Sequence, residues 1–141
     1  MEEYSILNDV KKMLGISAEY TPFDKDIVPL INTALFTLHQ LGIGPDEGFT
    51  ITEDSGQTWS DLIGDNKNLS AVRTYVYIKV RIVFDPPSSG FVLDALKEQA
   101  DELEWRLREQ VEIQAFNPAP KPKRSRKEQE YHDLIRKARG V

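Results

Sequence analysis

The longest regular pattern of apolar positions runs from residue 66 to residue 113 and divides at Asp85-Pro86-Pro87. Its first half, residues 66–84, is apolar around most of a helical circumference, which is typical of a buried helix. The apolar positions are Leu69, Val72, Tyr75, Val76, Ile78, Val80, Ile82 and Val83. The β-branched residues would suit a strand, but the run is about twice the usual strand length. We therefore predict a buried helix that ends before the prolines, which donate no backbone hydrogen bond.

The second half of this pattern predicts another helix. Ser88 or Ser89 could cap its first turn. A narrow apolar seam follows at spacings of three and four, formed by Leu93, Leu96, Ala100, Leu103 and Leu107. Three heptads are too short to require a coiled coil, so we interpret this helix as one member of a small bundle. The expected core unites residues of three helices: Leu35, Val76, Val80, Leu96 and Leu103.

The N-terminal part predicts two further helices. Residues 5–14 place apolar side chains on one face and end at Gly15. The second helix is expected to start at Thr21-Pro22, with Thr21 as the cap, and to end at Gly42. Pro29 interrupts its pattern, so we expect a kink there or a start nearer Asp26.

Residues 42–65 are rich in Gly, Asp, Ser and Thr. Alternation at 49–52, turn residues at 53–56 and a possible return at Thr58-Trp59 predict a short β-hairpin. A turn of helix at 59–63 should follow, with Asn66 as a candidate cap for the next helix. The expected fold is mainly α: a small bundle of about four helices with a short β-hairpin and an extended C-terminal tail.

Charge divides the chain into two predicted parts. Residues 116–141 hold eight basic and three acidic residues, a net charge of +5, and because the whole chain carries −5, residues 1–115 sum to −10. We expect a helical domain over 1–115 and a basic, Pro-rich tail over 116–141. A short amphipathic helix is predicted at 128–138, too short to be stable without a partner.

The tail has three possible roles: a solubilising extension, a DNA contact, or a docking segment that folds on a partner. The candidate contact residues are the basic and apolar positions Lys121, Lys123, Arg124, Arg126, Lys127, Tyr131, Leu134 and Ile135.

No pattern indicates catalysis. There is no cysteine, and the two histidines, His39 and His132, have no partner at ligand spacing. Gly42-Ile43-Gly44 lacks the third glycine of a phosphate-binding loop. We therefore predict neither an enzyme nor a bound metal or cofactor. Charged residues interrupt every apolar stretch, so no membrane span is expected, and the acidic N-terminus lacks a signal-peptide pattern.

Three residues are candidates for contacts between subunits. Arg73 and Arg81 share one face of the 66–84 helix. Their charged heads either reach solvent from a mostly buried helix or pair with acids of a neighbouring subunit. Trp105, like Trp59, is either a packing anchor or an interface residue.

An ordered set of segments resembles the head–tail connector proteins of long-tailed bacteriophages, also called adaptor or head-completion proteins. The segments are Ile31-Asn-Thr-Ala-Leu35, Leu38-His-Gln-Leu-Gly42, Phe49-Thr-Ile-Thr52, Thr58-Trp-Ser-Asp-Leu-Ile-Gly64, Leu69-Ser-Ala-Val-Arg-Thr-Tyr75 and Ile78-Lys-Val-Arg-Ile-Val-Phe-Asp-Pro-Pro87. The resemblance covers about residues 5–113, and Pro29 departs from it.

The resemblance implies a structural protein of the virion neck, made in the host bacterial cytoplasm. It implies a ring of about twelve copies beneath the portal. Such a ring would extend the channel for double-stranded DNA and bind the portal protein and the next head-completion or tail protein. An acidic body suits a channel through which DNA slides, because affinity for phosphate comes from Lys and Arg. The alternative is a helical DNA-binding regulator, which would need a basic recognition helix.

Overall fold

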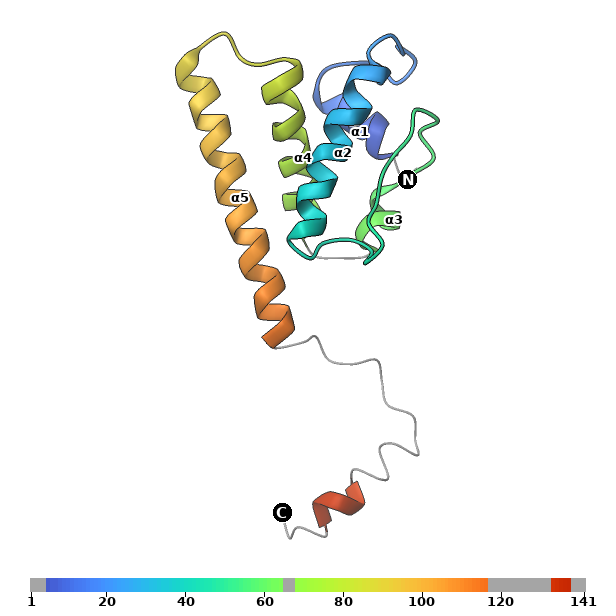
Figure 1. The fold of residues 1–141 in the computed structure, drawn as a ribbon, viewed down its shortest axis with the longest axis vertical. Helices are drawn as coiled ribbons and strands as arrows, with labels where there is room; N and C mark the ends of the chain where they lie inside the picture. The colour runs from blue at the N-terminus through green and yellow to red at the C-terminus, as the bar shows by residue number, and fades with distance from the viewer. Residues whose placement is uncertain (1–4, 65–67, 117–132, 138–141) are drawn as a thin grey trace. The chain divides into compact units, whose positions relative to one another are not determined.

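The computed structural model describes residues 5–64, 68–116 and 133–137 of the chain. Its elements are α1 (Ile6–Met13), α2 (Asp24–Gln40), α3 (Trp59–Ile63), α4 (Leu69–Phe84) and α5 (Gly90–Phe116), and residues 133–137 are also helical. The mainly helical prediction is confirmed (Figure 1). The chain forms two compact units, 1–111 and 112–141.

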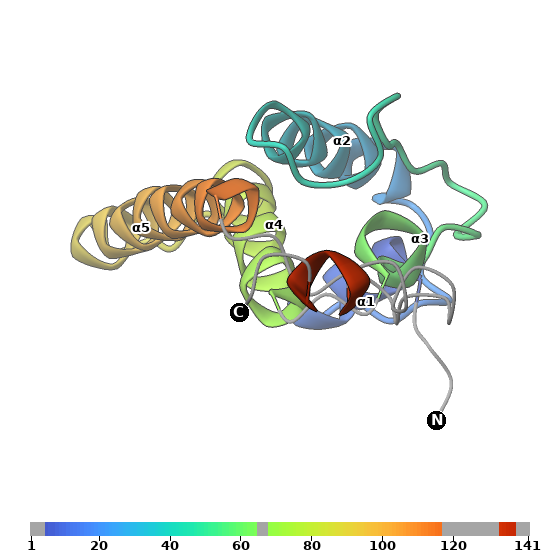
Figure 2. The same ribbon diagram turned by 90° about the horizontal axis from the view of Figure 1, so that it is seen from below.

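Helices α1, α2 and α4 build the centre of the first unit. The largest contact between helices is that of α2 with α4, and α1 packs on both (Figures 1 and 2). Each of the three turns an apolar face inward, as the spacing predicted, and Leu35, Val76 and Val80 are buried. Burial of such apolar side chains is the main stabilising contribution to the fold.

Helix α5 contributes to this core through its later turns. Leu107 and Ala100 are 2% and 3% exposed, whereas Phe91 near the start of the helix is 85% exposed. Leu96 and Leu103, which were expected to be largely buried, are both half-buried, and Leu103 packs against the core.

The start of α2 differs from the predicted one. The helix begins at Asp24, and Phe23 occupies the N-cap position without a side-chain hydrogen bond. Thr21 and Pro22 instead form the preceding turn, in which the Thr21 carbonyl accepts the Asp24 N–H at 3.1 Å. Pro29 lies inside the helix, which continues to Gln40. A proline so near the start removes a single backbone bond, the one that would reach the carbonyl of Lys25.

The predicted β-hairpin is wrong. Residues 42–64 contain no strand, and an isolated antiparallel bridge joins Ser5 to Thr58. The Asn32 side chain of α2 takes the place of a partner strand: its amide nitrogen donates to the Ile51 carbonyl at 3.1 Å, and its oxygen accepts the Ile51 N–H at 2.8 Å. The alternating residues are therefore extended but pair with a side chain instead of a second strand.

The helix predicted at residues 59–63 is confirmed as α3. Thr58 and Asp61 form a capping box in which each side chain accepts the backbone N–H of the other residue. α4 begins at Leu69, and the predicted cap Asn66 lies outside the described residues. At α5 the Ser89 hydroxyl accepts the Val92 N–H at 3.4 Å. In the part of the chain that the structure describes, no helix is both long and apolar enough to cross a bilayer.

Candidate interaction surfaces

A buried carboxylate joins three helices of the first unit. Asp9 of α1 is 3% exposed. Its Oδ2 accepts the Trp59 indole N–H at 2.8 Å and the Arg73 Nε–H at 2.7 Å, and its Oδ1 accepts Arg73 Nη2 at 2.9 Å. The hydrogen bonds to this carboxylate raise the pKa of the Arg73 guanidinium. The network fixes α1, α3 and α4 relative to one another, and Trp59 is buried as part of it.

The three predicted inter-subunit residues lie on two helices. Arg73 is engaged with Asp9 of its own chain, with 39% of its side chain exposed. Arg81 donates from Nη1 to the Tyr77 hydroxyl at 2.9 Å. Trp105 on α5 is 57% exposed. Their contact with a neighbouring subunit stays a prediction.

Sequence reasoning missed a second buried charge, Lys11. Its side chain is 0% exposed and pairs with Asp24 at 2.8 Å. The ammonium also donates to the carbonyls of Ala18 and Tyr20, at 3.1 and 2.7 Å. A signal was present, because Lys11 lies four residues after Leu7 and three before Leu14, on the apolar stripe of α1. This pair fixes the loop between α1 and α2.

The loop ends in an exposed aromatic cluster. The rings of Tyr20 and Phe23 have centroids 5.6 Å apart, and Phe23 meets Phe84 at 5.3 Å in an edge-to-face arrangement. Tyr20 and Phe23 are 50% and 40% exposed.

The predicted tail contacts lie mostly outside the described residues. These are Lys121, Lys123, Arg124, Arg126, Lys127 and Tyr131. Of the other two, Leu134 is 65% exposed and Ile135 is half-buried. Their binding to a partner stays a prediction.

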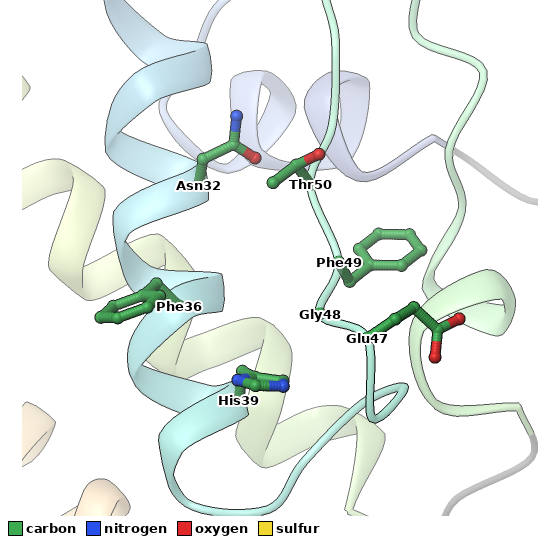
Figure 3. Close-up of a pocket in the computed structure, with 7 residues that line it drawn as sticks. All are labelled: Asn32, Phe36, His39, Glu47, Gly48, Phe49 and Thr50. Carbon is green, nitrogen blue, oxygen red and sulfur yellow. The ribbon is translucent and has the colours of Figure 1, made fainter.

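A pocket of about 340 Å³ lies between α2 and the extended segment that follows it (Figure 3). Its lining combines two aromatic rings with polar groups: Asn32, Phe36, His39, Glu47, Gly48, Phe49 and Thr50. His39 Nε2 lies 3.0 Å from the Asp46 carbonyl oxygen. The extended segment is therefore attached to α2 at both ends, by His39 at Asp46 and by Asn32 at Ile51. Sequence reasoning did not find this pocket, because it assigned its second wall to a hairpin.

The pocket lies in the longest stretch of the chain without a Lys or Arg. No Lys or Arg occurs between Lys25 and Lys67, whereas seven acids do: Asp26, Asp46, Glu47, Glu53, Asp54, Asp61 and Asp65. Asp46 and Glu47 are exposed beside the pocket. The pKa of Asp54 is lowered mainly by the hydrogen bond that its carboxylate accepts from the Thr52 hydroxyl, and further by the one that it accepts from the Gly56 N–H. The described residues include no cluster of side chains suited to a metal ion.

The helical unit is held together by buried ion pairs. It offers two kinds of surface for binding macromolecules: exposed aromatic side chains and a pocket with exposed acids beside it. A family model described as phage connector protein matches residues 6–114. The chain belongs to the phage connector protein family. This confirms the resemblance found in the sequence and gives the chain a structural role as a connector of the phage virion. No match was found among curated proteins or among solved structures.

Proposed function

We propose that this connector forms a ring beneath the portal, extends the DNA channel and joins the head to the tail. The observation that carries the proposal is the family match over residues 6–114. The charge of the chain supports it, because residues 1–115 carry a net charge of −10 and a wall of that sign does not hold DNA phosphates. The proposed role is structural, with no reaction and no cofactor.

The proposed partners are further copies of the chain in a ring of about twelve, the portal protein, and the next head-completion or tail protein. Arg73, Arg81 and Trp105 are proposed to contact the neighbouring subunit. Trp105 fits this role best, because an exposed tryptophan is an effective anchor at protein interfaces.

The tail is the proposed attachment to the portal. Tyr131, Leu134 and Ile135 would be the apolar anchors. The basic residues Lys121, Lys123, Arg124, Arg126 and Lys127 would draw the tail to an acidic portal surface. Contact of these five residues with DNA is the alternative for the same segment.

Truncation after Phe116 tests this attachment, because it leaves α5 whole. The shortened chain should keep the thermal unfolding transition of the helical domain and fail to co-sediment with purified portal. The Tyr131→Ala, Leu134→Ala double variant should show most of the same loss, whereas reversal of two tail charges should mainly increase the sensitivity of binding to salt. Unchanged portal affinity after truncation would rule out the docking role.

A gel-shift titration separates the connector from a DNA-binding regulator. Sequence-dependent DNA binding by residues 1–115 at moderate salt would favour the regulator.

A further inference from the structure

The outer side of α5 carries exposed aromatic and acidic side chains and no basic one. In Figures 1 and 2 this helix lies at the edge of the first unit beside α4, and it packs inward through Ala100 and Leu107. The opposite side, which we call the outer stripe, repeats at spacings of four and three and consists of Phe91, Ala95, Glu98, Glu102, Trp105 and Glu109. Phe91 and Trp105 are 85% and 57% exposed. Because the solvent side of a surface helix is usually polar, these rings indicate a contact with another protein.

The acids of the outer stripe determine what kind of surface can cover it. Glu102 pairs with Arg106 of the same helix, with 2.8 Å between Oε1 and Nη2. Among the described residues, neither Glu98 nor Glu109 makes an ion pair. A partner must therefore offer cations as well as apolar surface, and an acidic partner would be repelled.

A locally basic surface of this kind lies on α4. One side of the helix, which we call the α4 face, is at least partly exposed and consists of Ser70, Arg73, Thr74, Tyr77 and Arg81. The cations of α4 are Arg73, Lys79 and Arg81, and the helix contains no acid, although residues 1–115 sum to −10. The chain itself thus provides the cations that the outer stripe lacks.

Arg81 is the cation of the α4 face that can accept a new partner. Arg73 is already engaged with Asp9 of its own chain. Arg81 donates from Nη1 to the Tyr77 hydroxyl at 2.9 Å, and this neutral partner leaves its charge uncompensated. No ion pair of Arg81 occurs in the part of the chain that the structure describes. A guanidinium beside an aromatic side chain can bind a carboxylate and also contact an indole ring.

The outer stripe and the α4 face cannot meet within one chain. The stripe lies on the side of α5 opposite to Ala100 and Leu107, so it points away from the α4 of its own chain. A contact between the two surfaces therefore joins two copies. Because it uses a different surface on each copy, one stripe and one α4 face stay free for the next neighbours. Such a contact continues from copy to copy and can close into a ring.

We propose that the outer stripe of α5 in one copy packs on the α4 face of the next copy. Trp105 lies against Tyr77 in this contact, and Glu109, one turn from Trp105, pairs with Arg81. The inference rests on the proposed ring and names the two surfaces that join its subunits.

Cysteine cross-linking of the full-length chain tests the contact. The chain has no cysteine, so introduced thiols report alone. Thr74→Cys and Glu102→Cys together place one thiol on the α4 face and one on the outer stripe. With a short bismaleimide, this double variant should give a ladder of dimers, trimers and larger products, because each copy is joined to two neighbours. The matched control replaces Thr74→Cys by Thr33→Cys, at an exposed position of α2, and should give no ladder.

Charge variants of the double-cysteine chain locate the ion pair. Arg81→Glu should reduce the yield of the ladder about five- to tenfold. Lys79→Glu is the same change of charge on the same helix, but it lies outside the α4 face and should leave the yield within about twofold. Adding Glu109→Arg to Arg81→Glu restores opposite charges and should recover most of the ladder.

Three results would overturn the proposal. The first is a double-cysteine chain that gives no product larger than a dimer, which would leave the outer stripe to a different protein. The second is an equal ladder from the Thr33→Cys control. The third is an equal loss from Arg81→Glu and Lys79→Glu, which would mean that only the total charge matters.

Electron microscopy of portal incubated with the chain separates this inference from the proposed function. The unsubstituted chain and Lys79→Glu should form rings on the portal, and Arg81→Glu should not. Equal rings from Arg81→Glu would refute the contact and leave the ring role in place. Absence of rings with the unsubstituted chain would refute the ring role, whereas the cross-linking ladder tests the contact without portal.

Discussion

Asp9 shows at the scale of one residue how a charge in a core can hold several elements together. Removing its carboxylate leaves the buried Trp59 indole N–H without an acceptor, and Arg73 without its partner. An unsatisfied buried donor costs about 1–3 kcal/mol. Because 39% of the Arg73 side chain is exposed, water can take over part of that partnership.

We therefore expect Asp9→Ala to lower the free energy of unfolding by about 1–3 kcal/mol in urea denaturation. The matched control is Asp94→Ala, which removes an exposed carboxylate from α5. It should change the free energy of unfolding by under about 0.5 kcal/mol. Equal effects of the two substitutions would contradict the bridging role of Asp9.

Tyr75 predicts a loss of stability at alkaline pH. Its side chain is buried and its hydroxyl donates to Glu104 Oε2 at 3.2 Å. Burial, and then the charge of Glu104, raise the pKa of Tyr75 above its ordinary value. The neutral phenol is thus favoured in the folded state. The unfolded phenol titrates at about pH 10. Below that pH the contribution of Tyr75 to the free energy of unfolding is complete, and it is lost as the pH rises further.

Ultraviolet absorbance of phenolate measures this directly. Of the five tyrosines, Tyr75 should ionise only as the chain unfolds. Tyr75→Phe should remove part of the alkaline loss of stability. Reversible ionisation of all five in the folded chain near pH 10 would show that Tyr75 is not shielded.

At the scale of elements, the period of the apolar residues predicted the helices, and glycine and proline predicted where they end, more reliably than either predicted the contacts between them. Gly42 was expected to end α2, and it has a φ of +94°, a conformation that glycine adopts without strain. The hairpin was mispredicted because alternation indicates extended backbone and does not reveal the hydrogen-bond partner. Here that partner is the side chain of Asn32, nineteen residues away in sequence.

Helix α5 provides the test at this scale. Leu107 is 2% exposed and belongs to the core, whereas Leu103 is half-buried. Leu107→Ala should cost about 2–5 kcal/mol, because it leaves a cavity in an enclosed site. Leu103→Ala should cost less, since water can fill part of the space. Thermal or urea unfolding of both variants measures the difference, and a larger loss for Leu103→Ala would contradict the described packing of α5.

At the scale of the whole molecule, composition separated an acidic body from a basic tail, and the ordered segments identified the family. The candidate tail contacts followed from charge and apolar spacing. The pocket could not be predicted in the same way, because its walls come from α2 and from a segment whose place depends on Asn32 and His39. The ion pairs of Lys11 with Asp24 and of Arg73 with Asp9 could not be predicted either, because each joins residues that only the tertiary fold brings together.

The proposed assembly predicts concentration-dependent behaviour. The isolated chain should be a monomer or a weak oligomer, and rings should form on the portal or at high concentration. Light scattering over a concentration series measures this. A stable symmetric dimer at every concentration would argue against a ring, whose interface joins two different surfaces of adjacent copies.

The central claim is that copies of this chain form a ring between the portal and the tail. Cryo-electron microscopy of virion necks, from particles assembled with this chain, tests it most directly. The account predicts a closed ring of helical units matching α1 to α4, coaxial with the portal and in contact with it. A neck in which other chains fill the whole space between portal and tail would contradict it.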